Sequence, residues 1–408
     1  MESAATHHHK ARGILSVAVL GSRCAGKSTL LGHLLVKIGG IEPQGMAHRL
    51  ARAEQDANDA GQRDAAYAWV VYKRKAERSL SMTLDLNVQC CTTCKHKITF
   101  TDTPGTREAV RFVARGVAGQ DAAVVVVDAS CADPLGERAV ADTDQGLLYE
   151  HVLIAYGMGI RQLVVAINKM DAVNFSQERF EEVQAEVLKV LKKANYNEEQ
   201  RRKVVFVPVA GLPGDNLDEL SGRMPWFERT QGATLLEAIE AFRPLARPTQ
   251  PLHQPEQQQQ QQQNGKEAVA KGGYAGLVMP VQCVIKVSGI GTVCLGRIEA
   301  GSAKAGMQVG FVPCMSRHKG LILACPVKSL ESHCESFVCA SSSSHSSSTA
   351  GAGPHSCSFG SSGHDGVLGP GHSVGMALRG ITQRQLRKGW VAVDAEHPPK
   401  LVSAGDPW

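Results

Sequence analysis

Near the start of the chain, a glycine-rich run followed by lysine and serine joins an expected strand to an expected helix. The run reads Gly21-Ser22-Arg23-Cys24-Ala25-Gly26-Lys27-Ser28 and continues with Thr29. The backbone N–H groups of such a loop surround phosphates, the lysine reaches the outer phosphates, and the serine hydroxyl binds Mg²⁺. We therefore predict a loop that binds the phosphates of a nucleotide.

A second polar group, Asn168-Lys169-Met170-Asp171, closes a later apolar strand. The carboxylate of Asp171 can accept both N–H groups on the edge of guanine, and Asn168 can approach the purine from its other side. Ligands bind where parallel strands end. After the next expected strand, Ala210-Gly211-Leu212 would turn its backbone amides toward the guanine oxygen. These residues predict GTP or GDP, rather than ATP, as the nucleotide.

The run Asp102-Thr103-Pro104-Gly105 also follows an apolar strand. Asp102 would hold Mg²⁺ through water, and the Gly105 amide would contact the third phosphate, so this segment would respond to the nucleotide. Thr83 is the candidate for a second hydroxyl on the metal. The predicted magnesium ligands are therefore Ser28, Thr83 and Asp102. The predicted GTP-binding residues are 21–29, 102–105, 168, 169, 171 and 210–212.

Residues 13–243 alternate apolar runs with helical patterns, which indicates an α/β P-loop domain with a mostly parallel sheet flanked by helices. The clearest helix starts after Ser176, a predicted N-cap, and places Phe180, Val183 and Val187 on one apolar stripe. The expected strands of this domain are Ile14–Leu20, Leu84–Val88, Ile98–Asp102, Ala122–Asp128, Gln162–Asn168 and Val204–Val209.

Composition changes twice after this domain. Residues 244–273 are rich in proline and include the run Gln257–Gln263, which predicts a linker. Residues 274–408 alternate short β-rich runs with glycine turns and predict an all-β barrel, interrupted by a Ser/Gly-rich insertion at about 339–370. The expected barrel strands are Gln282–Val287, Gly291–Ile298, Met307–Pro313, Gly375–Leu378 and Trp390–Val393.

Charge and hydropathy narrow the class of protein. The net charge of +5, from 44 Lys and Arg against 39 Asp and Glu, is too small to predict nucleic-acid binding, so no DNA partner is expected. No apolar run reaches the length of a membrane span, and the first residues lack a signal core. A cytoplasmic protein without a membrane partner is the expectation, and its 12 cysteines would be reduced.

Four sulfur and imidazole side chains, Cys90, Cys91, Cys94 and His96, lie at the expected tip of a hairpin. Half of a zinc site has this spacing, but no second pair of cysteines completes it. A solvent-facing thiol cluster is therefore the favoured interpretation, and a metal site is the alternative.

Longer runs resemble those of one family, eukaryotic translation elongation factor 1-alpha, along nearly the whole of its first two domains. They are Gly32-His33-Leu34-Leu35, Gly39-Gly40-Ile41, Tyr67-Ala68-Trp69-Val70, Lys75-Ala76-Glu77-Arg78, Glu150-His151, Gly214-Asp215-Asn216, Met224-Pro225-Trp226-Phe227, Gly289-Ile290-Gly291-Thr292-Val293, 296–301 and 304–307. The resemblance implies a GTPase that carries aminoacyl-tRNA to the ribosome, with GTP, GDP and Mg²⁺ as cofactors and a nucleotide exchange factor as a further partner.

Departures from the family limit what the resemblance implies, and low-complexity insertions in the linker and in the second domain are among them. In the family a histidine after D-x-P-G orients the attacking water, and Thr106 stands at that position here. Cys24 replaces an aspartate of the phosphate-binding loop. Ser79-Leu80-Ser81-Met82 stands where the family has Arg-Gly-Ile before the switch threonine. The family's third domain is expected to be absent, since the chain stops at Trp408. We therefore expect GTP binding to persist while hydrolysis is weakened at Thr106.

Three other interpretations remain open at this level. Thr106 and the missing third domain favour a pseudo-GTPase, a binding module that regulates translation without turnover. A ribosome-rescue or release-factor type of GTPase is the second, although the runs quoted above resemble the elongation branch more closely. A decayed copy without a stable role is the third, and the intact phosphate and base motifs argue against it.

Overall fold

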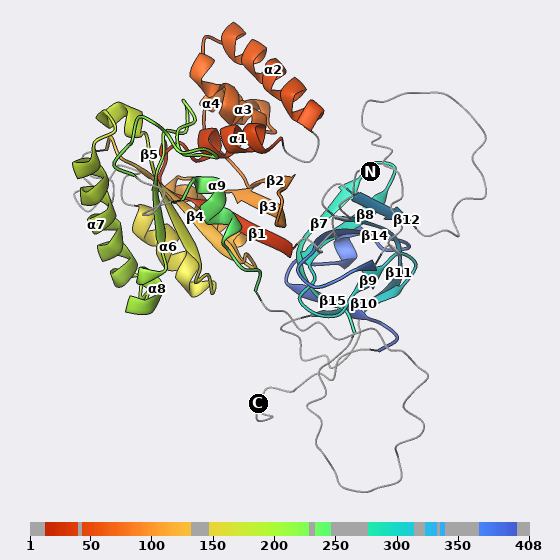
Figure 1. Ribbon diagram of the computed structural model, residues 1–408. Helices are drawn as coiled ribbons and strands as arrows, with labels where there is room; N and C mark the ends of the chain where they lie inside the picture. Colours follow the sequence, from red (N-terminus) through yellow and green to blue (C-terminus); the bar gives the residue numbers. More distant parts are fainter. Residues whose placement is uncertain are drawn as a thin grey trace, which may run out of the picture. The chain divides into compact units, whose positions relative to one another are not determined.

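The structure of the protein is a computed structural model (Figure 1). It describes residues 13–39, 43–131, 147–227, 233–245, 276–313, 323–332, 335–338 and 367–397. The chain forms two compact units, one extending to Leu245 and the other beginning at Ala246. Most of the predicted linker and of the Ser/Gly-rich insertion lies outside the described residues, which resume at 276 and 367.

The first unit is built on a six-stranded sheet in the order β2-β3-β1-β4-β5-β6. All neighbouring strands are parallel except β2 and β3, which form an antiparallel pair at one edge. The strands are β1 (Gly13–Leu20), β2 (Asn87–Thr92), β3 (His96–Asp102), β4 (Ala122–Asp128), β5 (Leu163–Asn168) and β6 (Val205–Pro208).

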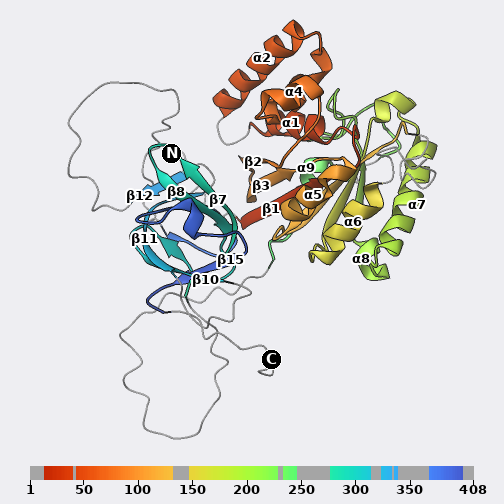
Figure 2. The ribbon, with the colours of Figure 1, turned by 180° about the vertical axis from the view of Figure 1, so that it is seen from behind.

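Helices cover both faces of this sheet, as the apolar composition of its strands requires. Alternate residues of β4 belong to two separate cores. Val124 and Val126 share one with residues of α1, α2, α3 and α9, whereas Val125 and Val127 share the other with residues of α5, α6 and α7. Both views show α1 to α4 grouped together (Figures 1 and 2). The helices are α1 (Lys27–Ile38), α2 (Pro43–Asp59), α3 (Ala66–Val71), α4 (Lys75–Leu80), α5 (Val110–Val117), α6 (Leu147–Gly157), α7 (Gln177–Lys193), α8 (Glu198–Arg202) and α9 (Leu235–Glu240), with 3-10 turns η1 (Arg63–Ala65), η2 (Arg107–Ala109) and η3 (Met170–Val173).

The expected α/β class is correct, and the predicted helix after Ser176 is α7, whose N-cap hydroxyl accepts a hydrogen bond from the Arg179 amide at 3.2 Å. The predicted strand Leu84–Val88 is wrong in its first three residues and ends too early. The Leu84 amide donates to the Glu77 carboxylate at 3.1 Å, so residues 84–86 stay out of the sheet and β2 runs from Asn87 to Thr92.

The second unit is an antiparallel barrel, as predicted. Its sheet runs β10-β15-β7-β8-β14-β11-β12, and a further pairing of β10 with β11 closes six of these strands into a ring. Apolar side chains fill the ring, among them Met279, Cys294, Phe311 and Cys325. The strands are β7 (Val278–Val287), β8 (Gly291–Arg297), β9 (Ala303–Lys304), β10 (Gln308–Pro313), β11 (Leu323–Ser332), β12 (Glu335–Val338), β13 (Val367–Leu368), β14 (Ser373–Leu378) and β15 (Trp390–Asp394), with a 3-10 turn η5 (Gln383–Gln385).

Within the described ranges, no helix combines the length and the apolar character that crossing a membrane would need.

Candidate functional site

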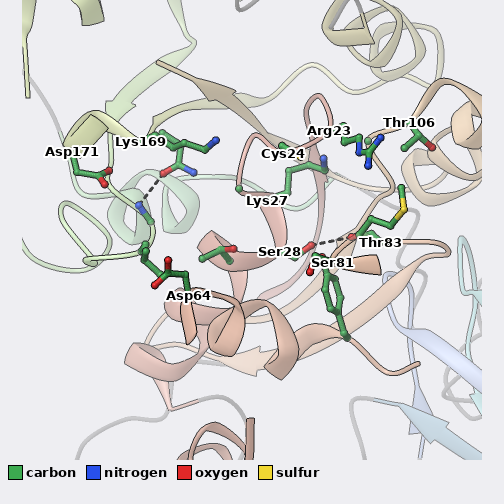
Figure 3. A pocket seen from close by; sticks show the side chains of 18 residues that line it. Arg23, Cys24, Lys27, Ser28, Asp64, Ser81, Thr83, Thr106, Lys169 and Asp171 are labelled. Atoms are coloured by element: carbon green, nitrogen blue, oxygen red, sulfur yellow. Dashed lines mark hydrogen bonds between the residues drawn. The ribbon is translucent and has the colours of Figure 1, made fainter. Parts of the chain in front are cut away.

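A cavity of about 460 Å³ lies where the parallel strands of the first unit end. It is lined by residues that follow β1, β3, β5 and β6 in the sequence, together with residues between α2 and β2. Figure 3 shows Lys169 and Asp171 at one end of the cavity, Thr83 and Thr106 at the other, and Lys27 between them. The convergence of loops from separate strands at one edge of the sheet is the arrangement in which α/β proteins bind ligands.

The predicted phosphate-binding loop connects the buried strand β1 to helix α1, which begins at Lys27. The Lys27 ammonium donates to the carbonyl oxygens of Gly21 and Ser22 at 3.0 and 2.9 Å. Burial lowers the pKa of Lys27 to about 8, while the nearby Asp102 and Cys24 act in the opposite sense. A cation with so little water around it interacts strongly with an anion that enters the cavity.

A buried histidine holds the start of this loop. The Gly21 amide donates to Nδ1 of His151 on helix α6 at 3.3 Å. Burial lowers the pKa of His151 to about 3, and the Lys27 charge adds to that effect. His151 is therefore neutral at physiological pH, which is the form in which Nδ1 can accept a hydrogen bond.

Ser28, Thr83 and Asp102 meet beneath the loop. The Ser28 hydroxyl donates to Oδ2 of Asp102 at 2.7 Å, the Thr83 hydroxyl donates to the same oxygen at 3.2 Å, and the two hydroxyl oxygens lie 2.9 Å apart. Asp102 is fully buried, and its Oδ1 has no hydrogen-bond partner among the described residues. Burial raises the pKa of Asp102 to about 6. Two hydroxyls and a carboxylate with an unused oxygen are the hard ligands that Mg²⁺ prefers, so these residues fit that ion.

Thr83 is positioned by the segment on either side of it. Glu77 of helix α4 is 1% exposed, and its carboxylate accepts hydrogen bonds from the Leu84 amide and the Asn87 side chain, both at 3.1 Å. On the other side, Ser81 ends α4 with a left-handed φ of 49°. Serine therefore adopts, at a cost, a conformation that suits glycine.

At the other end of the cavity, the Asn168 side chain joins two loops. Its Nδ2 donates to the Ala25 carbonyl at 2.8 Å, and its Oδ1 accepts from the Gly211 amide at 2.8 Å. Both polar atoms of this side chain are thereby used within the protein. Asn168 therefore ties the loop after β6 to the phosphate-binding loop. It also lines the cavity, and its approach to the purine stays a prediction.

The other residues near the end of the cavity that is predicted to bind guanine have different partners. Lys169 forms an ion pair with Asp128 at 2.6 Å. His33 Nδ1 lies 2.9 Å from the Gly211 carbonyl oxygen. Asp171, by contrast, is exposed and lines the cavity, so its carboxylate is available to a ligand.

The residues after β3 lie against the phosphate-binding loop. The Thr103 hydroxyl turns away from the cavity and donates to the Val19 carbonyl at 2.7 Å. A Cβ atom on Gly105 would come within 2.4 Å of the Lys27 ammonium nitrogen and 2.7 Å of the Arg23 amide nitrogen, so only glycine fits here. Thr106 lines the cavity next to it and is the N-cap residue of η2.

Most predicted site residues line this one cavity, but not all of them. Those that do are Arg23, Cys24, Gly26, Lys27, Ser28, Thr29, Thr83, Gly105, Thr106, Asn168, Lys169, Asp171, Gly211 and Leu212. The lining does not include Gly21, Ser22, Ala25, Asp102, Thr103, Pro104 or Ala210. Asp102 acts from beneath through Ser28 and Thr83.

Sequence reasoning missed two residues of the cavity wall, Asp64 and Tyr72. Asp64 lies in the 3-10 turn η1, and Tyr72 follows helix α3. Neither belongs to a short motif with a fixed spacing, so a single sequence carries no signal for them. Ser81 and Met82, noted as departures from the family, also line the cavity.

The favoured interpretation of the cysteine cluster is wrong for Cys91. This residue lies within β2, pairs with Ile98 of β3 and is 1% exposed, and burial raises its pKa to about 12. Cys94, in the turn that follows, is exposed. Nowhere in the described ranges do three His, Cys, Asp or Glu side chains gather in a way that could hold a metal ion.

The fold and the cavity together define a class: a P-loop GTPase domain followed by the β-barrel typical of translation factors. Residues 12–244 match the family described as elongation factor Tu GTP binding domain. Elongation factor 1-alpha-A of Schizosaccharomyces pombe is 33% identical over 405 residues, covering 97% of this chain and 73% of that protein. Elongation factor 1-alpha of Meyerozyma guilliermondii is 34% identical over 397 residues, covering 95% of this chain and 71% of that protein. The chain belongs to this family of GTP-binding translation elongation factors, and its sequence relatives are elongation factor 1-alpha proteins.

Solved structures agree on the fold. The GTPase-like domain of Saccharomyces cerevisiae Ski7, bound to GDP and inorganic phosphate, aligns with a TM-score of 0.63 at 15% identity, over 94% of this chain and 75% of that one. A bacterial selenocysteine-specific elongation factor, EF-Sec, aligns with a TM-score of 0.55 at 14% identity. That alignment covers 94% of this chain and 45% of the EF-Sec chain. At these identities the likeness extends to the fold alone.

Proposed function

We propose that the protein binds GTP and GDP with Mg²⁺ in the cavity of its first unit. The observation that carries this proposal is the convergence of Lys27, Ser28, Thr83 and Asp171 on one cavity from three separate segments. Chance could produce one of the motifs. It would not be expected to bring all of them together around a space that can hold a ligand.

Each end of the cavity has its own task. Lys27 and the loop amides bind the phosphates, and Asp171 accepts the N–H groups of guanine. Ser28 and Thr83 would hold Mg²⁺ directly and Asp102 would hold it through water. Mg²⁺, when bound, would offset the negative charge of the outer phosphate oxygens. Asn168 fixes the distance between the two ends because it bonds Ala25 and Gly211.

Substitution Asp171→Asn tests the base specificity. An amide in place of the carboxylate puts a donor where guanine also has donors, so GDP affinity should fall by at least about 10-fold, and xanthosine diphosphate, which has a carbonyl there, should bind better than GDP. The measurement is displacement of a fluorescent GDP by each nucleotide. The matched control is Asp218→Asn, because Asp218 is paired with Lys37 away from the cavity. If Asp171→Asn left GDP affinity unchanged, Asp171 would not be the base-reading residue.

We further propose that the protein acts in translation in the cytoplasm, with the ribosome, aminoacyl-tRNA and an exchange factor as candidate partners. Its family relatives are elongation factors, and that membership supports the proposal. Delivery of aminoacyl-tRNA is the specific activity proposed. Co-sedimentation of the GTP-loaded chain with ribosomes, and its retention of labelled aminoacyl-tRNA, would test the two partners separately.

A second candidate is a GTP-binding module with slow turnover, and Thr106 favours it. Thr106 lines the cavity beside Gly105, at the position of the family's water-orienting histidine. A threonine hydroxyl reaches less far than an imidazole and cannot carry a positive charge. The protein would then bind GTP, hold it and engage partners in that state. Turnover measured with and without ribosomes separates this candidate from a working GTPase.

A further inference from the structure

His33, a buried histidine of helix α1, contacts the loop that is predicted to meet guanine. The residue is 7% exposed, and its Nδ1 lies 2.9 Å from the Gly211 carbonyl oxygen. A carbonyl oxygen can only accept a hydrogen bond, so Nδ1 carries the hydrogen and donates it. Burial lowers the pKa of His33, so the ring is neutral at physiological pH. The single N–H group of the neutral ring therefore holds the Gly211 carbonyl.

Gly211 is held through both polar groups of its backbone. Its carbonyl accepts from His33, and its amide donates to Oδ1 of Asn168 at 2.8 Å. A Cβ atom on Gly211 would lie 3.1 Å from Asn168 Oδ1 and 3.1 Å from Cδ1 of Leu30, so α1 and Asn168 leave little room around this residue. Two supports from separate elements, helix α1 and the end of strand β5, therefore fix the loop that follows β6.

Tight packing sets the direction in which the His33 ring points. The ring stacks on Tyr67 of α3, with centroids 3.9 Å apart and an interplanar angle of 7°. A Cβ atom on Gly32 would lie 1.9 Å from the Tyr67 carbonyl oxygen, so only glycine lets α1 and α3 approach this closely. Near the ring edge, a Cβ atom on Gly214 would lie 2.5 Å from Cε1 of His33. To turn away from Gly211, the ring would have to displace one of these neighbours.

Helix α1 joins the two ends of the cavity. It begins with Lys27 and Ser28, which line the phosphate end, and carries His33 further along. The position of Gly211 relative to the phosphate-binding residues is therefore set by one helix and one N–H group. A loop that is already in place binds its ligand without the cost of being ordered.

We propose that His33 is a positioning residue of the guanine site, whose N–H group holds the loop of residues 210–212 where it meets the base. The inference rests on the proposed guanine-nucleotide function. His33 does not line the cavity, so it acts through the loop and not on the nucleotide. A loop that occupies its binding position for only a fraction of the time lowers the affinity by that fraction. Loss of the N–H group should therefore weaken the binding of guanine nucleotides and spare ligands that bind only at the phosphate end.

The test compares His33→Leu with His33→Asn. The two new side chains have the same size and branching, and both lack the ring, but asparagine can place an N–H donor where Nδ1 was. GDP affinity should fall by about 3- to 10-fold in the leucine variant, which is the usual net effect of one hydrogen bond, and the asparagine variant should recover most of that loss. Displacement of a fluorescent GDP measures both affinities. His33→Met is a second variant without a donor, and its flexible side chain adapts to the space left by the ring if the leucine variant does not fold.

Two further ligands show where the effect arises. Inorganic tripolyphosphate has no base, so it should bind His33→Leu and the wild-type chain equally. Inosine diphosphate keeps the oxygen of guanine but lacks the amino group that Asp171 would bind, so the ratio of GDP to inosine diphosphate affinity reports on Asp171 and should not change. The matched control is His96→Leu. His96 also has a ring nitrogen near a backbone carbonyl, 3.3 Å from that of Glu240, but neither residue lines the cavity.

The outcomes distinguish this inference from the function on which it rests. If the wild-type chain bound no guanine nucleotide, the proposed function would fail. If the wild-type chain bound GDP and the leucine and asparagine variants of His33 bound it with equal affinity, the inference alone would fail. An equal loss of tripolyphosphate binding, or a changed ratio of GDP to inosine diphosphate affinity, would also overturn it, because His33 would then act through the fold or through Asp171. Circular dichroism without nucleotide checks that each variant is folded.

Discussion

Two buried side chains around the phosphate-binding loop are shifted toward their uncharged forms. Burial lowers the pKa of His151 to about 3 and raises that of Asp102 to about 6. The cost of keeping a charge away from water explains both shifts. His151 is therefore uncharged at physiological pH and adds no second positive charge beside Lys27.

His151 should make the stability of the protein depend on pH. It is neutral when folded, but its ordinary pKa of about 6.5 lets it take up a proton in the unfolded chain. The unfolded state therefore binds more protons below that value, and stability falls as pH falls from about 6.5 toward 3. Between pH 7.5 and 5.5 the loss should be about 1.4 kcal/mol. Urea unfolding at the two pH values measures it.

The control for this prediction is His151→Gln, which keeps a hydrogen-bond acceptor near Gly21 but cannot be protonated. Asp102 acts in the opposite sense, since its raised pKa favours the folded state as pH falls below about 6. That contribution is common to both proteins and cancels in the comparison. An equal pH dependence in the two proteins would show that His151 is protonated in the fold or exposed to water.

Among the elements, helix α4 ends at a residue with a strained backbone. Ser81 has a left-handed φ of 49°, and its exposed hydroxyl donates to the Gln62 side chain at 2.7 Å. Cys24, in the phosphate-binding loop, has a φ of 59°. Both positions line the cavity, which fits the tendency of strained backbone to collect at functional sites.

Ser81→Gly should raise the free energy of unfolding by about 0.5–1 kcal/mol, because glycine adopts this φ without a steric penalty. The lost hydrogen bond to Gln62 is exposed and offsets only part of the gain. Ser79→Gly is the matched control: it lies inside α4, where glycine should lower stability by about 0.5 kcal/mol. Chemical denaturation of both variants gives the values. Equal losses in the two variants would mean that Ser81 carries no strain.

The elements also show how far sequence patterns reach. Strand β4 and helix α7 were predictable, because an unbroken apolar run and a capped amphipathic stripe are local signals. The start of β2 was not, because it depends on the Glu77 carboxylate binding the Leu84 amide seven residues away. Asp171 and Lys27 were readable from motifs. Tyr72 was not, since its place depends on the packing of α3 against α1.

Across the whole molecule, every residue of the proposed site belongs to the first of the two compact units. Ligand binding stabilises the state that binds it. At a GDP concentration about 100 times the dissociation constant, with Mg²⁺, the free energy of opening should rise by about 2.7 kcal/mol. Hydrogen exchange of the buried amides of β1 and β4 measures this rise.

The barrel supplies the internal control for that experiment. Amides of β8 and β14, which pair with each other in the second unit, should keep their exchange rates when GDP is added. Equal protection of both units would contradict a site built from the first unit alone.

We propose that this chain binds GTP in an intact site, and the slow-turnover candidate adds that hydrolysis is weakened at Thr106, which lines the cavity beside Gly105. The most direct test is single-turnover hydrolysis of preloaded GTP by the wild-type chain, Thr106→His and Thr106→Val, with bound GTP quantified in each. We predict equal binding by all three and slow hydrolysis by the wild type and Thr106→Val. Thr106→His should be about 10-fold faster or more, because a positioned imidazole contributes on the order of 10²–10⁴-fold to such steps. Hydrolysis by the wild-type chain as fast as that of Thr106→His would contradict it.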